Sequence, residues 1–124
     1  MKTFFLMVLA AAALVITACG PTCVGTSCSC AEGQTCNFTA CDANTSSCQL
    51  DCAKDASCSG TCGANCQVTC AGKDCTASVG ANSQVTCTGG TCNITCNGSC
   101  SVAASGGSLS LTCKGGTQTP GGCT

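Results

Sequence analysis

Residues 68–87 read VTCAGKDCTASVGANSQVTC, and residues 94–113 read ITCNGSCSVAASGGSLSLTC. Each segment begins with a β-branched residue followed by Thr-Cys, then passes through a glycine-containing turn and a stretch of small residues. Each closes with Val or Leu followed by Thr-Cys, and the opening and closing apolar residues are 17 positions apart in both segments. The chain therefore contains a repeat, with copies of apolar-Thr-Cys at 68–70, 85–87, 94–96 and 111–113.

The four copies predict four short strands in equivalent positions. Alternate side chains of a strand face opposite ways, so Val68 and Cys70 share one face while Thr69 takes the other. Stacked units of this kind bury together what a single unit cannot bury alone. We therefore expect an all-β or β-rich small disulfide-rich domain, built as a compact β-solenoid-like stack of short strands. A disulfide-stapled antiparallel sheet is the alternative, because hairpin turns produce similar spacing.

The string TCTGGTCNITC at 86–96 resembles the Thr-Cys repeats of insect hyperactive antifreeze proteins. The resemblance implies a small β-helix filled with disulfides. Those proteins carry regular Thr-x-Thr rungs, whereas within this string Thr86 and Thr88 alone have that arrangement, and the repeat spacings are 17 and nine residues. The resemblance therefore concerns the architecture and not ice binding.

The first 18 residues have the anatomy of a secretory signal. Lys2 supplies a positive charge, Phe4 to Ile16 form an apolar core, and Thr17 and Ala18 place small residues before Cys19. The apolar run is shorter than the roughly 18–20 residues that a bilayer-spanning helix needs. The alternative is cleavage by ordinary signal peptidase, which leaves a free Cys.

Residues 16–19, Ile-Thr-Ala-Cys, resemble the lipobox of bacterial lipoproteins. The resemblance implies that Cys19 becomes the mature N-terminus and carries acyl chains such as palmitate. It also implies an outer membrane lipoprotein of the cell envelope, on its periplasmic or surface-exposed face. Gly20 follows Cys19, so the aspartate that commonly signals inner-membrane retention at this position is missing.

This interpretation divides the chain into three parts. Residues 1–18 form a signal peptide with an N-terminal signal helix, and residues 19–35 form a lipid-anchored tether whose Pro21 and glycines disfavour regular structure. Residues 36–124 form a Cys-rich domain with the repeats at 68–87 and 94–113.

Disulfides are expected to carry much of the stability, because large hydrophobic side chains are few. After residue 18 these are Val24, Phe38, Leu50, Val68, Val79, Val85, Ile94, Val102, Leu109 and Leu111. The chain has 19 Cys, an odd number, and setting Cys19 aside leaves enough for nine disulfides. Disulfides persist in oxidising compartments, which agrees with export. The spacing leaves the pairing open. The expected structural disulfide cysteines are Cys23, Cys28, Cys30, Cys36, Cys41, Cys48, Cys52, Cys58, Cys62, Cys66, Cys70, Cys75, Cys87, Cys92, Cys96, Cys100, Cys113 and Cys123.

The composition argues against catalytic, cofactor and metal sites. Charged residues make up 7% of the chain, there is no His, and no basic patch exists to bind nucleic acid. A Ser or Cys nucleophile without His lacks its usual base. The C-x-x-C motif of thiol–disulfide enzymes is also missing.

An Asp–Asp pair, an Asp–Asn pair and four glycosylation sequons are interpreted as ordinary turn residues. Asp51 and Asp55 form a candidate carboxylate pair by their spacing in the sequence. Asp42 and Asn44 form a weak calcium candidate that does not match the EF-hand loop. The sequons begin at Asn37, Asn44, Asn93 and Asn97.

These features together favour a non-enzymatic envelope lipoprotein without a cofactor. Its disulfide-stabilised module would serve structure, adhesion or protein interaction. Its expected partners are the membrane, through the N-terminal lipid, and an envelope protein or surface. Two alternatives stay open: a thiolate metal-binding protein, and a secreted toxin or inhibitor on a disulfide scaffold.

Overall fold

The computed structural model describes residues 20–124, which form thirteen β-strands and no helix. Within this part of the chain, therefore, no helix is long and apolar enough to cross a bilayer. The expected signal peptide with its helix, and Cys19, lie outside the described residues. The strands are β1 (Thr22–Val24), β2 (Ser27–Cys30), β3 (Thr35–Phe38), β4 (Gln49–Cys52), β5 (Ser57–Thr61), β6 (Gln67–Cys70), β7 (Asp74–Gly80), β8 (Ser83–Cys87), β9 (Thr91–Asn97), β10 (Cys100–Ala104), β11 (Ser108–Lys114), β12 (Gln118–Thr119) and β13 (Gly122–Cys123).

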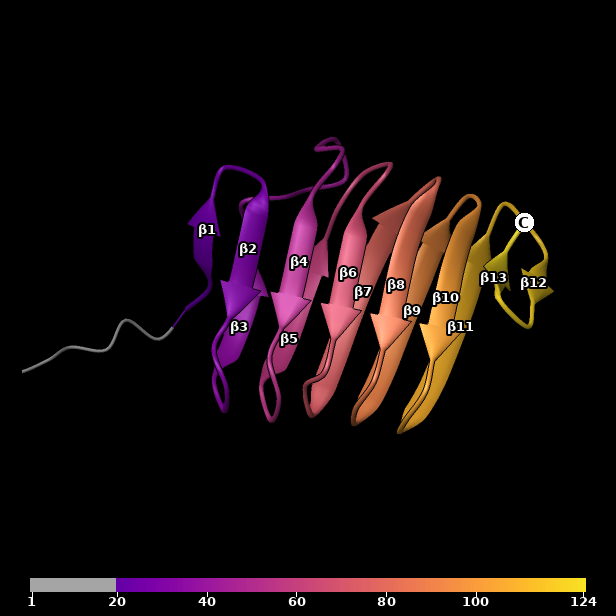
Figure 1. The fold of residues 1–124 in the computed structure, drawn as a ribbon. Helices are drawn as coiled ribbons and strands as arrows, with labels where there is room; N and C mark the ends of the chain where they lie inside the picture. Colours follow the sequence, from indigo (N-terminus) through magenta and orange to yellow (C-terminus); the bar gives the residue numbers. More distant parts are fainter. Residues whose placement is uncertain (1–19) are drawn as a thin grey trace, which may run out of the picture.

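The strands stack into a β-solenoid of two facing sheets (Figure 1). Sheet A has the order β1-β2-β4-β6-β8-β10-β13-β12, and sheet B has the order β11-β9-β7-β5-β3. The chain alternates between the sheets, so each turn of the solenoid adds one parallel strand to each of them. Antiparallel pairing is confined to the two ends, where β1 covers β2 and the β12–β13 hairpin covers β10. The predicted solenoid is thus confirmed, and the antiparallel alternative is not adopted.

One turn of the solenoid equals the 17-residue spacing of the repeat. Val68 lies opposite Val85 in the β6–β8 pair, and Ile94 lies opposite Leu111 in the β9–β11 pair. Val85 and Ile94 are nine residues apart because the chain crosses from sheet A to sheet B between them. The threonine of each copy faces outward, as predicted.

The core is a narrow layer between the two sheets. Sheet A contributes a column of aliphatic residues from Leu50 to Val102, and sheet B contributes a column from Phe38 to Leu111. Gly60 leaves room for the ring of Phe38, because a Cβ at Gly60 would lie 3.1 Å from the Phe38 Cβ. Val24 and Leu109, near the two ends of the stack, are the exposed large hydrophobic residues of the described chain.

The segment 20–35, expected to lack regular structure, contains β1 and β2. The difference has a local cause: the Cys23–Cys28 disulfide ties β1 to β2 across a turn in which Gly25 adopts a positive φ of 61°. The glycine that argued against a strand therefore makes the hairpin turn possible.

Candidate functional site

Each disulfide of the structure joins a cysteine to the next cysteine along the chain. Sixteen of the 18 predicted structural cysteines are paired in this way. The pairs are Cys23–Cys28, Cys30–Cys36, Cys41–Cys48, Cys52–Cys58, Cys62–Cys66, Cys87–Cys92, Cys96–Cys100 and Cys113–Cys123. The spacing between consecutive cysteines was visible in the sequence, but it did not reveal this rule.

The disulfides line both edges of the solenoid as two ladders. The first ladder lies at the bends from sheet A to sheet B and consists of Cys30–Cys36, Cys52–Cys58 and Cys87–Cys92. The second ladder lies at the bends from sheet B to sheet A and consists of Cys41–Cys48, Cys62–Cys66, Cys96–Cys100 and Cys113–Cys123. The ladders thus cross-link the two sheets on both sides of the narrow core.

Cys70 and Cys75 are buried thiols that occupy one rung of the first ladder. Cys70 lies in register between Cys52 and Cys87, and Cys75 lies in register next to Cys92. The Cys70 thiol donates a hydrogen bond to the Cys75 sulfur, which raises the pKa of Cys70 and lowers the pKa of Cys75; burial raises the Cys70 pKa further. Their expected disulfide stays a prediction.

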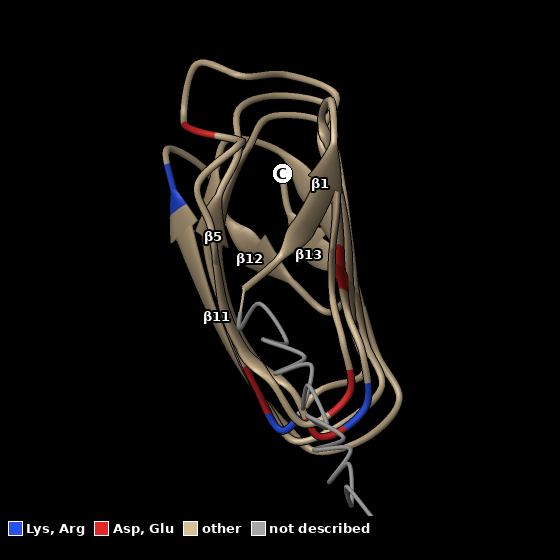
Figure 2. Ribbon diagram, turned by 90° about the vertical axis from the view of Figure 1, so that its left-hand side faces the viewer, with Lys and Arg blue, Asp and Glu red and all other residues tan. Residues whose placement is uncertain are grey.

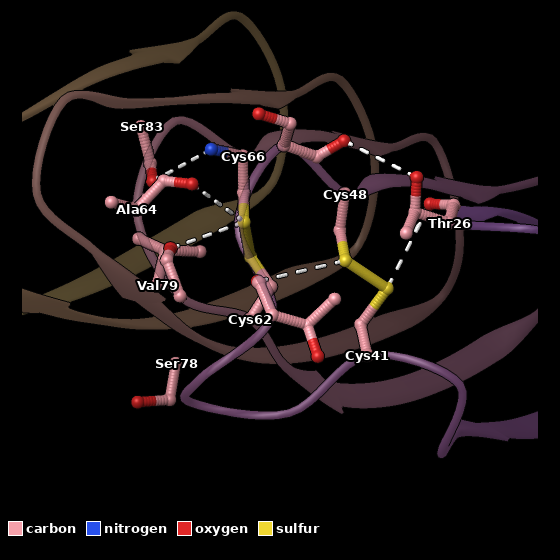
Figure 3. The surroundings of a disulfide bond; sticks show 12 residues. Thr26, Cys41, Cys48, Cys62, Ala64, Cys66, Ser78, Val79 and Ser83 are labelled. Carbon is pink, nitrogen blue, oxygen red and sulfur yellow. Dashed lines mark hydrogen bonds between the residues drawn. A yellow bond between two sulfur atoms is a disulfide. The ribbon is translucent and has the colours of Figure 1, made fainter.

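The second ladder has one rung without cysteine. Val79 lies in register with Cys96, and Ser83 lies in register with Cys100, so this pair of side chains stands where a disulfide would stand. Both are buried, and the Ser83 Oγ accepts a hydrogen bond of 3.1 Å from the Cys66 backbone N–H. Figure 3 shows Ser83 and Val79 beside the Cys62–Cys66 disulfide, with Cys41–Cys48 on its other side.

Two groups of sulfur atoms approach closely enough to be considered for a metal ion. The Sγ atoms of Cys70, Cys87 and Cys92 lie within 4.8 Å of one another, as do those of Cys96, Cys100 and Cys123. Five of these six sulfurs belong to disulfides, which lack the thiolate charge that soft metals require. Cys70 is the one thiol among them.

Charged residues gather at the bends of the first ladder, and few lie on the strands of the two sheets (Figure 2). Residues 20–124 contain eight charged side chains, and five of them lie at or next to these bends. The five are Glu32, Lys54, Asp55, Lys73 and Asp74. Of the candidate carboxylate pair, Asp51 faces outward on sheet A, whereas Asp55 occupies a turn with a φ of 59°.

Asp42 organises the long loop between β3 and β4. Its Oδ1 accepts a 2.9 Å hydrogen bond from the Thr45 hydroxyl and a 2.8 Å bond from the Asn44 backbone N–H. These two bonds hold the pKa of Asp42 below its ordinary value of 3.8. Asn44 thus supports the carboxylate through its backbone, in the manner of a turn.

A groove of about 590 Å³ crosses the outer face of sheet B. Its floor consists of two rows of outward side chains, Asn37–Ser59–Thr76 and Thr61–Ser78–Thr95, from β3, β5, β7 and β9. Its wall is the beginning of the β3–β4 loop, residues 39–43, which includes Asp42. This groove was not predicted from the sequence, although polar residues at alternate positions, repeated at the 17-residue period, were the available signal.

The chain has no match among known protein families, curated proteins or solved structures.

Proposed function

We propose that this protein is a non-enzymatic envelope lipoprotein that is anchored by acyl chains on Cys19. Its disulfide-cross-linked β-solenoid would serve as an interaction module. The observation that carries the proposal is the consecutive pairing of cysteines. Among residues 20–124 this rule uses 16 cysteines in disulfides and leaves Cys70 and Cys75, which are also consecutive, beside each other. Pairing within residues 20–124 therefore needs no sulfur from Cys19, which agrees with the proposed acylation of that residue.

The disulfides also indicate an oxidising environment, extracellular or in the envelope. Two acyl chains or more on one residue hold a protein firmly at a membrane, because each buried CH₂ contributes about 0.8 kcal/mol. The anchor would then keep the solenoid at one surface, with its outer faces available to a partner.

The interaction role is supported by the outer surfaces of the two sheets. The row Gln49–Gln67–Gln84 on sheet A and the rows of the groove on sheet B carry short or amide side chains on a cross-linked frame. Such a surface offers many hydrogen-bonding groups in fixed positions, which suits recognition of another molecule.

Intact mass spectrometry of the protein purified from its own membrane tests the proposal. We expect a chain that begins at Cys19 and carries acyl groups, and a Cys19→Ser variant that is found outside the membrane fraction. A native chain that begins elsewhere and carries no acyl group would overturn the anchor. Activity against a broad panel of hydrolase and redox substrates would overturn the non-enzymatic part.

A thiolate metal-binding protein is the second candidate, and the buried thiols of Cys70 and Cys75 favour it. A bound metal requires these two sulfurs as thiolates, so the thiol count discriminates the candidates. Stoichiometric metal that is released together with two alkylatable thiols would support metal binding.

A further inference from the structure

We propose that the groove on sheet B binds an extended chain of neutral sugars. This inference rests on the proposed interaction role and names the class of its ligand. The groove is formed by the two rows Asn37–Ser59–Thr76 and Thr61–Ser78–Thr95 and by the wall of residues 39–43.

The floor offers hydrogen-bonding groups and no charge. All six side chains of the two rows are hydroxyls or an amide, and they stand on neighbouring parallel strands. Parallel strands are spaced about 4.8 Å apart, so equivalent hydroxyls recur along the groove at a distance comparable to the length of one sugar ring. A neutral polyhydroxylated chain is uncharged like this surface, can exchange hydrogen bonds with it, and repeats at a spacing similar to that of the strands.

Hydrogen bonds restrict Asn37 and Ser78 among the six floor side chains. The Ser59 hydroxyl donates to the Asn37 Oδ1 at 3.3 Å, so the Asn37 side-chain N–H₂ is left to donate. The Asn97 side-chain N–H₂ donates to the Ser78 Oγ at 2.9 Å, so the Ser78 hydroxyl hydrogen points elsewhere. The Asn37 amide therefore presents its donor in a defined place, and one acceptor position of the Ser78 hydroxyl is already filled.

The wall supplies the complementary acceptor. Both bonds that Asp42 receives from its own loop end on Oδ1, so Oδ2 has no hydrogen-bond partner among the described residues. The carboxylate is charged at neutral pH, as an ordinary aspartate is, and these bonds lower the Asp42 pKa further. A carboxylate accepts strongly from sugar hydroxyls and repels an acidic polymer, which favours neutral sugars over uronic acids.

The groove contains no aromatic ring on which a sugar could stack, because Phe38 points into the core and is 5% exposed. Binding through hydrogen bonds alone is expected to be weak, with a dissociation constant on the order of 1 mM. Many anchored copies on one surface would raise the effective strength by multivalency.

The test is a binding titration of the full, disulfide-intact chain in a detergent without a sugar headgroup. The probes are the hexasaccharides of β-1,4-glucose, β-1,4-N-acetylglucosamine and α-1,4-glucose, with the hexamer of galacturonic acid as the acidic comparison. Chemical shifts from ¹⁵N-labelled protein report where binding occurs. We expect at least one neutral probe to shift groove residues, and the acidic hexamer to bind more weakly.

Two matched variants localise the site. Thr76→Val removes a hydroxyl from the groove floor, and Thr86→Val removes one from the outer face of sheet A; both residues are exposed, and both replacements keep the β-branched shape. We expect the first to weaken binding about fivefold, the value of one hydrogen bond, and the second to leave it unchanged. Unchanged spectra elsewhere confirm the fold.

Three outcomes would overturn the inference. They are no binding of any neutral probe at millimolar concentration, equal loss in both variants, and shifts that depend on protein concentration alone, which would assign the face to a second copy of the chain. Because the titration does not depend on the acyl groups, a lipidated protein that binds no sugar refutes the ligand and leaves the anchor standing.

Discussion

Cys70 and Cys75 occupy a rung whose neighbours on both sides are disulfides. The backbone register fixes Cys70 beside Cys52 and Cys87, and it fixes Cys75 beside Cys58 and Cys92. The strands that carry the flanking disulfides therefore already hold the two thiols near each other. The interaction between the two neighbouring sulfurs raises the pKa of Cys70 and lowers the pKa of Cys75.

We predict that oxidation closes Cys70 and Cys75 as a ninth disulfide in the mature protein. The measurement is mass spectrometry after alkylation without reduction, in which the eighteen cysteines of the described residues should stay unmodified. A Cys70→Ser variant is the control, because it should expose one alkylatable thiol, at Cys75. Alkylation of both residues in the unreduced native protein would contradict the prediction and favour the metal-binding candidate.

A second prediction concerns Asp42, whose carboxylate is stabilised by hydrogen bonds from Thr45 and Asn44. Because its folded pKa is lowered, the contribution of this carboxylate to the loop is present above pH 3.8 and is lost as the pH falls through the lower folded value. Thr45→Val should raise the Asp42 pKa toward 3.8, since the Thr45 hydroxyl is the larger cause of the shift. An NMR titration of the carboxyl carbon measures the change, and an unaltered pKa in the variant would refute the assignment.

At the scale of the elements, the sequence predicted strands well where the period is regular. The four apolar-Thr-Cys copies lie in β6, β8, β9 and β11, and the 17-residue spacing gave their parallel register. The register of the earlier turns was not predicted, because their lengths differ. The β2-to-β4 step takes 22 residues, since the β3–β4 loop is longer than its counterparts.

Neither the disulfide pairing nor the groove could be predicted from the sequence, and the reasons differ. Eighteen cysteines allow about 3 × 10⁷ pairings, and only the folded register selects consecutive partners. The groove requires side chains from β3, β5, β7 and β9 to be brought together with a loop. Each of these residues alone is an ordinary surface Ser, Thr or Asn.

The gap in the second ladder leads to a third prediction. Val79 and Ser83 are four residues apart, as are the partners of Cys62–Cys66 and Cys96–Cys100 in the adjacent rungs. The double replacement Val79→Cys with Ser83→Cys should therefore form an added disulfide and stabilise the fold by about 2 kcal/mol. The gain is reduced by the loss of the Ser83 hydrogen bond to Cys66.

Thermal unfolding of the double variant measures the change in stability. Mass analysis of its thiols shows whether the added disulfide has formed. Each single cysteine variant is a control that loses the native contact without gaining a cross-link, so it should be less stable than the native protein. Two free thiols in a folded double variant would show that the rung does not have disulfide geometry.

The whole molecule depends on its cross-links because its core is one narrow layer. The inward-facing columns hold few large side chains, and cysteines make up much of the buried set. Removing the disulfides leaves the strands with little apolar area to bury against each other. The fold is therefore conditional on oxidation.

We predict that full reduction abolishes the β-sheet signal in far-ultraviolet circular dichroism under otherwise native conditions. Reoxidation in dilute solution should restore the signal, because each disulfide has its partner nearby in the chain. Retention of native circular dichroism with all thiols alkylated would contradict the dependence on cross-links.

The largest sequence separation of any disulfide here is ten residues, and the others are shorter. A chain that emerges from a translocation channel N-terminus first can therefore finish each cross-link before the following turn has appeared. The oldest turn then serves as the template on which the next one docks. For an exported chain the order of emergence and the order of pairing would then coincide, because no disulfide of residues 20–124 spans more than ten residues.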